Sequence, residues 1–202
     1  MRKIGAIILA AGGSSRLGQP KQLLPFRGKT LVRTVVDAAR EAGCSPVVVV
    51  IGSNGEKIHR ELEHANVIEV QNANWHRGIG NSIRIGVQAL TNHEPDVDAI
   101  LLLVCDQPAV NAALLEGLIA TYRATKKEIV ASCYADTVGV PALFNRVLFE
   151  ELLSLDEERG AKSIILRNRE RVAQLAFPAG AIDIDSWEDW ERLDKTESSR
   201  NK

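Results

Sequence analysis

The chain begins with IGAIILA at residues 4–10, an unbroken apolar run that leads directly into AGGSSRLGQPK at residues 11–21. A short run that is apolar at every position is typical of a strand buried on both faces, between two layers of helices. Glycines and polar residues directly after such a run are typical of the loop that follows a strand. This opening therefore predicts the first strand of an α/β domain rather than a cleaved signal peptide.

The rest of the chain repeats this alternation of apolar runs and helical patterns. Strands are predicted at residues 47–51, 67–70, 99–104, 129–134, 141–144 and 172–177, and helices at residues 31–42, 56–64, 79–90, 112–125, 146–155, 160–167 and 186–193. Strands that alternate with helices indicate a mostly parallel sheet that is covered on both faces. We predict a single-domain, Rossmann-like, three-layer α/β/α fold over residues 1–194. The polar residues 195–202 are expected to form a disordered tail.

The composition argues against several classes of protein. The 202 residues carry 25 Lys and Arg against 26 Asp and Glu, and the resulting net charge of -1 gives no general attraction to nucleic acid or an anionic membrane. No apolar run reaches the roughly 18 residues that a membrane-spanning helix needs. The three cysteines lack CxxC spacing and indicate neither a disulfide framework nor a zinc site. These observations predict a cytoplasmic protein without nucleic-acid or membrane partners.

The loop at residues 11–21 is the first candidate site. Gly12 and Gly13 allow backbone amides to approach a ligand closely, and Arg16 and Lys21 supply two positive charges. Amides and cations after a buried strand are typical of a phosphate-binding site. The GxGxxG pattern is absent, and the loop lacks the Lys-Ser or Lys-Thr that ends a Walker A motif. The alternative is a simple turn in which the glycines serve only the backbone geometry.

A second candidate site begins at Asp106, which directly follows the apolar run at residues 99–105. A carboxylate at the ligand-binding edge of a parallel sheet is well placed to hold Mg²⁺. Asp183 and Asp185 point the same way if their segment is extended, so one of them can complete a metal site with Asp106. The alternatives are that Asp106 only starts a turn and that Asp185 only helps to cap the helix near Ser186.

Together these motifs resemble those of the MobA-like nucleotidyltransferases. The resemblance rests on LAAGGSSRLGQPKQLLPFRGKTLV at residues 9–32 and continues in order through residues 74–75, 78–83, 105–108, 139–144, 159–162 and 183–186. Within the family, Leu-Ala-Ala-Gly at residues 9–12 is similar to the molybdenum cofactor cytidylyltransferase (MocA) branch, whereas the GTP-using branch has Leu-Ala-Gly-Gly. The methyl group of Ala11 narrows the base pocket, which favours a pyrimidine.

The resemblance implies a nucleotide-diphosphate transferase fold and a Mg²⁺-dependent transfer of CMP from CTP to the phosphate of molybdopterin, with release of pyrophosphate. Such a transfer asks the protein mainly for positioning and charge compensation. The implied partners are CTP, a molybdopterin-type acceptor, and a molybdoenzyme or its maturation chaperone. The alternatives are an NTP transferase that acts on a sugar or polyol phosphate, and a nucleotide-binding or cofactor-chaperone module without turnover.

The resemblance also implies the role of individual residues. The nucleotide-binding residues are implied to be Leu9, Ala10, Ala11, Gly12, Gly13, Arg16, Lys21, Gly80, Asn81, Ser82 and Asp106. Of these, Arg16, Lys21 and Asp106 are the implied catalytic residues, because the two cations clamp the triphosphate and Asp106 holds the Mg²⁺. The second metal-binding carboxylate is implied to be Asp183, with Asp185 as the alternative.

Some residues depart from the family pattern or have simpler explanations. Val140 stands where the family often has His, and Lys162 where Arg is usual, both on the side where the family binds its acceptor. Ser186-Trp187 replaces the customary Thr-Pro. Trp187 is expected to pack its own helix, and the charged run at residues 156–159 is expected to be a solvated helix end. Trp75 is expected to anchor its loop or to stack on a ligand.

Overall fold

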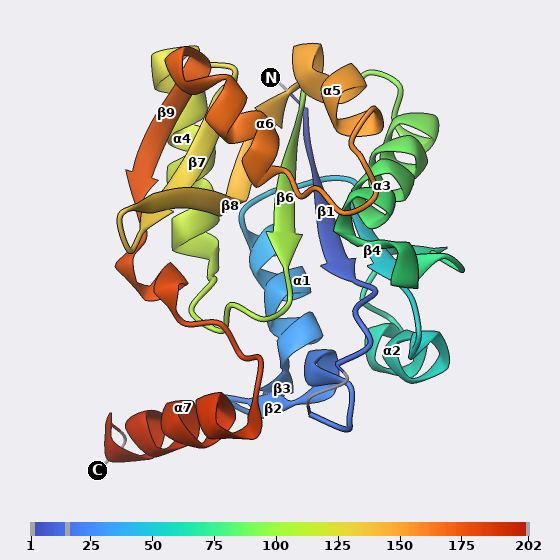
Figure 1. Ribbon diagram of the computed structural model, residues 1–202, viewed down its shortest axis with the longest axis vertical. Helices are drawn as coiled ribbons and strands as arrows, with labels where there is room; N and C mark the ends of the chain where they lie inside the picture. Colours follow the sequence, from blue (N-terminus) through green and yellow to red (C-terminus); the bar gives the residue numbers. More distant parts are fainter. Residues whose placement is uncertain (1–2, 15–16, 201–202) are drawn as a thin grey trace.

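In the part of the chain that the structure describes, a seven-stranded sheet runs through the middle of the molecule (Figure 1). The structure is a computed structural model and describes residues 3–14 and 17–200. The strands, in sheet order, are β5 (Ile68–Gln71), β4 (Val47–Ile51), β1 (Ile4–Ala10), β6 (Ala99–Val104), β8 (Thr137–Asn145), β7 (Ile129–Tyr134) and β9 (Val172–Ala176). Neighbouring strands are parallel except that β8 runs antiparallel to β6 and β7. The predicted mostly parallel sheet is therefore confirmed.

Helices cover both faces of this sheet. One face carries α1 (Leu31–Glu41), α2 (Gly55–Leu62) and α4 (Ala112–Thr125), and the other carries α3 (Ile79–His93), α5 (Phe149–Leu153) and α6 (Lys162–Arg167). Because side chains alternate along a strand, Ile8 of β1 is buried against the first group of helices and Ile7 against the second. This alternation builds two hydrophobic cores, and the three-layer α/β/α prediction is confirmed.

The predicted bounds of β1, β4, β6, β7 and α4 agree with the structure residue for residue. Strands that are buried on both faces have sharp ends in the sequence, because the apolar run stops where the chain leaves the core. The start of α4 is equally well marked, since the Asn111 side chain caps it by accepting a hydrogen bond from the Leu114 amide at 3.0 Å.

Strand β8 is longer than predicted. The sequence indicates a strand only at residues 141–144, because Gly139 and Pro141 both weaken a central strand. In the structure the pairing of β7 with β8 shifts register between Ala131 and Ser132, which leaves Val140 and Pro141 out of the ladder. The strand therefore continues past the proline without needing its missing N–H group.

The last helix, α7 (Trp187–Arg200), is also longer than predicted, and the expected end at Leu193 is wrong. No glycine or proline follows Leu193 before Arg200, so no residue there breaks the helix. The division into a domain at residues 1–194 and a tail at residues 195–202 stays a prediction, and residues 201 and 202 lie outside the described residues.

A small third core lies at the edge of the sheet toward which the arrowheads of β1 and β6 point in Figure 1. Two short strands that the sequence did not predict, β2 (Pro25–Phe26) and β3 (Lys29–Thr30), form a hairpin there. The core contains Leu17, Leu24, Phe26, Leu31 and Ile184, with Trp190 and Leu193 packed against it. It joins the loop after β1 to α7. None of the helices in the described residues is both long and apolar enough to cross a membrane.

Candidate active site

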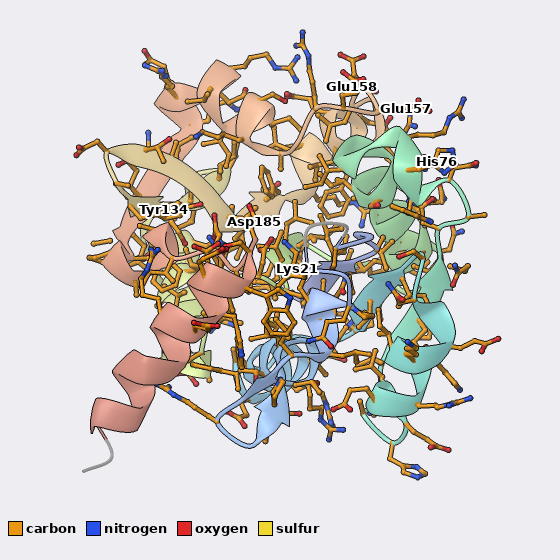
Figure 2. All side chains as sticks on the ribbon, turned by 60° about the horizontal axis from the view of Figure 1, so that its bottom comes forward. Lys21, His76, Tyr134, Glu157, Glu158 and Asp185 are labelled. Carbon is orange, nitrogen blue, oxygen red and sulfur yellow. The ribbon has the colours of Figure 1, made fainter. Side chains whose placement is uncertain are left out.

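At this edge of the sheet, a lysine lies between two carboxylates. Lys21 Nζ is 2.6 Å from Oδ2 of Asp106 and 3.0 Å from Oδ1 of Asp185. Lys21 belongs to the loop after β1, Asp106 follows β6, and Asp185 lies shortly before α7 (Figure 2). Because β1 and β6 are parallel neighbours, the loops at their carboxyl ends meet. The structure thus brings together three of the residues that the sequence singled out.

A buried glutamine shapes the loop that carries Lys21. Gln22 is 2% exposed, and its Nε2 donates hydrogen bonds to the carbonyl oxygens of Ala10 at 2.9 Å and Gly12 at 2.8 Å. The Lys21 amide donates to Oγ of Ser14 at 2.9 Å. These bonds fold the loop back over the end of β1. The sequence did not single out Gln22, because a glutamine in a loop is usually exposed and nothing in the sequence indicates that this one is buried.

Residues 182–186, here called the strap, carry the carboxylate of Asp185 to Lys21. The amide of Ile184 donates a hydrogen bond to the carbonyl oxygen of Asp106 at 3.0 Å, and the Ile184 side chain is fully buried in the third core. This attachment leaves Asp185 beside Lys21. Asp183 does not contact Lys21 but lies close enough to these carboxylates for their charges to affect its pKa.

The pKa shifts in this cluster indicate an excess of negative charge. Burial alone lowers the pKa of the Lys21 ammonium, but the charge and hydrogen bond of Asp106, with smaller effects from Asp185, raise it above its ordinary value. Burial raises the pKa of the Asp183 carboxyl, and the charges of Asp106 and Asp185 raise it further, against a hydrogen bond from Gln107. A further cation at this site would offset the repulsion among the carboxylates.

Beside the Lys21–Asp106 pair lies a cavity of about 330 Å³. It is lined by Leu9, Ala11, Gly12, Gly13, Lys21, Gln22, Trp75, His76, Gly78, Ile79, Ser82, Val104, Cys105 and Asp106. Seven of the predicted nucleotide-binding residues are in this lining, whereas Ala10, Gly80 and Asn81 are not. Arg16 lies outside the described residues.

Trp75 forms one wall of the cavity. Its ring lies against Gly13, where a Cβ atom would come within 2.7 Å of the ring. The absence of a side chain at position 13 therefore allows the close approach of the indole, and a larger residue there would displace the ring. The two roles considered for Trp75 are compatible. The ring lies against the loop at residues 11–21, here called the glycine loop, and it also borders the cavity.

The start of α3 is organised by a buried asparagine. Asn72 is fully buried, its Nδ2 donates to Oγ of Ser82 at 2.9 Å, and its Oδ1 accepts from Nδ2 of Asn81 at 2.9 Å and from the Asn74 amide at 3.0 Å. Asn81 is therefore engaged in holding this segment rather than lining the cavity. Asn72 directly follows β5, so the rule that singled out Asp106 after its strand would have found it as well.

The acidic run at residues 156–159 packs against this same segment. The amide of Gly80 donates to the carbonyl oxygen of Glu157 at 2.8 Å, and the Glu157 carboxylate is 3.2 Å from the Arg77 guanidinium and 3.6 Å from that of Arg84. Figure 2 shows Glu157 and Glu158 on the same side of the molecule as His76. The side chains of Asp156, Glu158 and Arg159 are exposed, as expected of a solvated end after α5. In addition, glycines at positions 78 and 80 let the backbone of the run approach the α3 backbone closely.

We expect Gly80→Ala to lower the free energy of unfolding by about 1–3 kcal/mol, the usual effect of overpacking. A Cβ atom at this position would lie 2.0 Å from the Asp156 carbonyl oxygen and 2.9 Å from that of Arg159, and backbone atoms cannot move aside easily. Gly160→Ala is the matched control, because its Cβ would meet only Ile79 at 3.6 Å. Urea unfolding followed by circular dichroism compares the two variants, and equal stabilities would contradict the prediction.

Gln107 and Tyr134 form a second polar group next to Asp183. Gln107 is 2% exposed, and its Nε2 donates to the carbonyl oxygen of Gly180 at 3.2 Å and lies 3.4 Å from the Tyr134 hydroxyl. Its Oε1 is buried without a hydrogen-bond partner among the described residues. Sequence reasoning missed both residues, since Gln107 is separated from Tyr134 and Gly180 along the chain.

The carboxylates fit a hard divalent cation. Within residues 3–14 and 17–200, no three His, Cys, Asp or Glu side chains converge closely enough to hold a metal ion by themselves. The Lys21 ammonium does, however, contact oxygens of both Asp106 and Asp185, so these two carboxylates already bind one positive charge together. Mg²⁺ is usually bound by one or two carboxylates and completes its coordination with substrate phosphates and water. The residues present therefore fit a cation that is shared with a phosphorylated substrate.

A model of the MobA-like NTP transferase domain matches residues 6–172 of this chain. The match includes Lys21 and Asp106 and ends at the first residue of β9. The strap and α7 therefore lie outside it, although Asp185 completes the charged cluster.

Solved structures match almost the whole chain. The crystal structure of Rv0371c from Mycobacterium tuberculosis H37Rv has a TM-score of 0.78 and 32% sequence identity, over 96% of this chain and 98% of that chain. A crystal structure of Rv0371c in complex with manganese has a TM-score of 0.78 and 30% identity, over 95% and 97% of the two chains.

Curated relatives match over part of their own length. Nicotine blue oxidoreductase from Paenarthrobacter nicotinovorans is 33% identical over 123 residues, which are 59% of this chain and 57% of that protein. The bifunctional protein GlmU from Syntrophotalea carbinolica is 32% identical over 166 residues, which are 80% of this chain and 34% of that protein. The chain thus matches 57% or less of the length of each of these two proteins.

Proposed function

Because the chain belongs to the MobA-like NTP transferase family, we propose that it transfers CMP from CTP to the phosphate of molybdopterin and releases pyrophosphate. The observation that carries the proposal is the Lys21 ammonium, which lies between Asp106 and Asp185 beside a cavity lined by the glycine loop. An NTP transferase needs such a combination of a cation, acidic side chains and close backbone approach.

The proposed reaction is a displacement at the α-phosphorus of the NTP. An oxygen of the acceptor phosphate forms the new bond to phosphorus, and the bond between the α-phosphorus and the bridging oxygen of pyrophosphate breaks. Lys21 offsets the negative charge that develops on the leaving pyrophosphate. The loop at residues 10–13 holds the nucleotide, and Arg16 is proposed as a second cation for the triphosphate. No nucleophilic side chain is required, because the acceptor supplies the attacking oxygen.

A divalent cation belongs to this proposal. Asp106 would hold it together with Asp185 or Asp183, and the complex of Rv0371c with manganese supports a divalent metal as the cofactor. When bound, Mg²⁺ would offset the charge of the phosphate oxygens and orient them. The position of Asp185 beside Asp106 and Lys21 favours it as the second ligand.

The choice of CTP rests on Ala11. Its side chain is buried and borders the cavity, where a methyl group reduces the room for a base. A hydrophobic difference of this size discriminates between substrates by about 1–3 kcal/mol. The choice of molybdopterin rests on the sequence motifs, and a molybdoenzyme or its maturation chaperone is proposed as the receiver of the product in the cytoplasm.

We expect CTP with Mg²⁺ to raise the melting temperature by roughly 5–10 °C at about 100 times its dissociation constant, since binding then adds about 2.7 kcal/mol. GTP, ATP and UTP are expected to give smaller shifts, and EDTA should remove most of the CTP effect. Differential scanning fluorimetry measures all four nucleotides, with and without metal. No shift for any nucleotide in the presence of metal would refute the proposal.

The acceptor is tested by pyrophosphate release. Purified protein with CTP and Mg²⁺ should release pyrophosphate when molybdopterin is added. Release with a sugar or polyol phosphate, and none with molybdopterin, would replace the acceptor and retain the transfer. Nucleotide binding without pyrophosphate from any acceptor would instead indicate a binding module.

A further inference from the structure

Trp187, the first residue of α7, is connected to the glycine loop at the other end of the chain. Its indole Nε1 donates a hydrogen bond to the carbonyl oxygen of Leu17 at 3.1 Å. The Trp187 residue is 43% exposed, so the indole is not a core side chain. The sequence predicts that Trp187 packs its own helix, and this prediction does not include the contact with the loop.

Leu17 lies in the part of the loop that leads to Lys21. Its amide donates to the Ser14 carbonyl oxygen at 3.0 Å, and the Ser14 hydroxyl accepts from the Lys21 amide at 2.9 Å. The Leu17 side chain is 4% exposed and packs in the third core. The indole of Trp187 therefore holds the backbone that sets the position of the Lys21 ammonium.

The strap and Trp187 together contact three parts of the site within four residues. Ile184 is bonded to the Asp106 backbone, Asp185 to the Lys21 ammonium, and Trp187 to the Leu17 carbonyl. Each contact joins the C-terminal segment to a different element of the charged cluster. A segment beyond the matched family domain thus connects the loop after β1 with the end of β6.

The Trp187 indole is not needed to cap the N-terminus of α7. Oδ2 of Asp189 accepts hydrogen bonds from the amide of Ser186 at 3.0 Å and from its hydroxyl at 2.8 Å, so other residues make the helix start. The packing of α7 on the third core is supplied by Trp190 and Leu193. The indole N–H of Trp187 is directed to the loop instead.

We propose that Trp187 is a positioning residue of the nucleotide site, which holds the glycine loop in the conformation that binds the triphosphate. The proposal rests on the proposed function for the identity of the ligand. Because Trp187 contacts the backbone of Leu17, its effect on the loop can be measured on the protein without added nucleotide, separately from binding.

The experiment compares Trp187→Phe with Glu188→Gln, which changes an exposed side chain in the same turn of α7 and leaves the contact with Leu17 in place. We expect Trp187→Phe to accelerate amide hydrogen exchange at residues 12–23 by about fivefold or more, because the loop loses its anchor. Glu188→Gln should change exchange at these residues no more than in the rest of the protein. Unchanged exchange of the loop in Trp187→Phe would overturn the proposal.

The second readout is binding and turnover. Trp187→Phe should raise the Kd and the KM for CTP with Mg²⁺ about fivefold, while kcat at saturating CTP stays within about twofold, since the reacting groups are unchanged. Wild-type affinity for CTP in this variant would also overturn the proposal. Faster loop exchange in a protein whose wild type binds no NTP would support the positioning role and refute the proposed function.

Discussion

Asp106→Asn is expected to reduce nucleotidyl transfer by about 10³-fold or more. The asparagine retains the shape of the side chain but removes the charge that is proposed to hold a divalent cation, and such a cation is worth several kcal/mol in phosphoryl transfer. It also removes the negative partner 2.6 Å from the Lys21 ammonium. Pyrophosphate release at saturating CTP, acceptor and Mg²⁺ measures the loss.

The control for this variant is Asp96→Asn. Asp96 is exposed and precedes β6, so it lies at the opposite end of the strand from Asp106. Its replacement should leave the rate within about twofold, as is usual for surface substitutions away from a site. A melting temperature of Asp106→Asn near that of wild type would show that the loss is not due to unfolding. Full activity of Asp106→Asn would remove this carboxylate from the metal site.

Lys21→Met is expected to reduce transfer by about 10²-fold or more, the usual loss when one group that stabilises a developing negative charge is removed. Methionine has a similar length and retains the contacts of the aliphatic part of lysine. Steady-state pyrophosphate release measures the rate, and Lys29→Met is the control. Lys29 is an exposed cation that pairs with Asp37 at 2.6 Å, away from the cavity lining.

The same variant should respond more strongly to metal alone. Without the ammonium, Asp106 and Asp185 lose the positive charge that both of them contact, so Mg²⁺ or Mn²⁺ gains affinity. We expect metal without nucleotide to raise the melting temperature of Lys21→Met more than that of the wild type. An equal or smaller rise, together with wild-type activity, would place Lys21 outside the site.

Much of the fold could be predicted because its central strands are buried on both faces. The apolar runs of β1, β4 and β6 end where the chain leaves the core, and their parallel arrangement follows from the helices between them. Asp106 and Lys21 could be singled out for the same reason, since loops after neighbouring parallel strands meet at one edge. Strand β8 was predicted too short because a register shift depends on its partner strand.

The parts of the site that escaped prediction depend on contacts between distant segments. The sequence favoured Asp183 over Asp185 as the second carboxylate, and only the attachment of Ile184 to Asp106 shows that Asp185 is the one that reaches Lys21. The backbone contact of Glu157 with Gly80 likewise joins a loop to the start of α3, 77 residues away in the sequence, and a charged run by itself indicates an exposed position. Such contacts have no local signal in composition or periodicity.

The strap follows the last strand of the sheet in the chain. All seven strands are complete by Ala176, whereas Asp185 and Trp187 come later in the chain. The sheet can therefore be inherited unchanged while a short stretch near the C-terminus is exchanged, and with it the second carboxylate and the contact with the glycine loop. Because Ile184 of the same stretch is buried in the third core, a change there alters the charged cluster and the packing of α7 together.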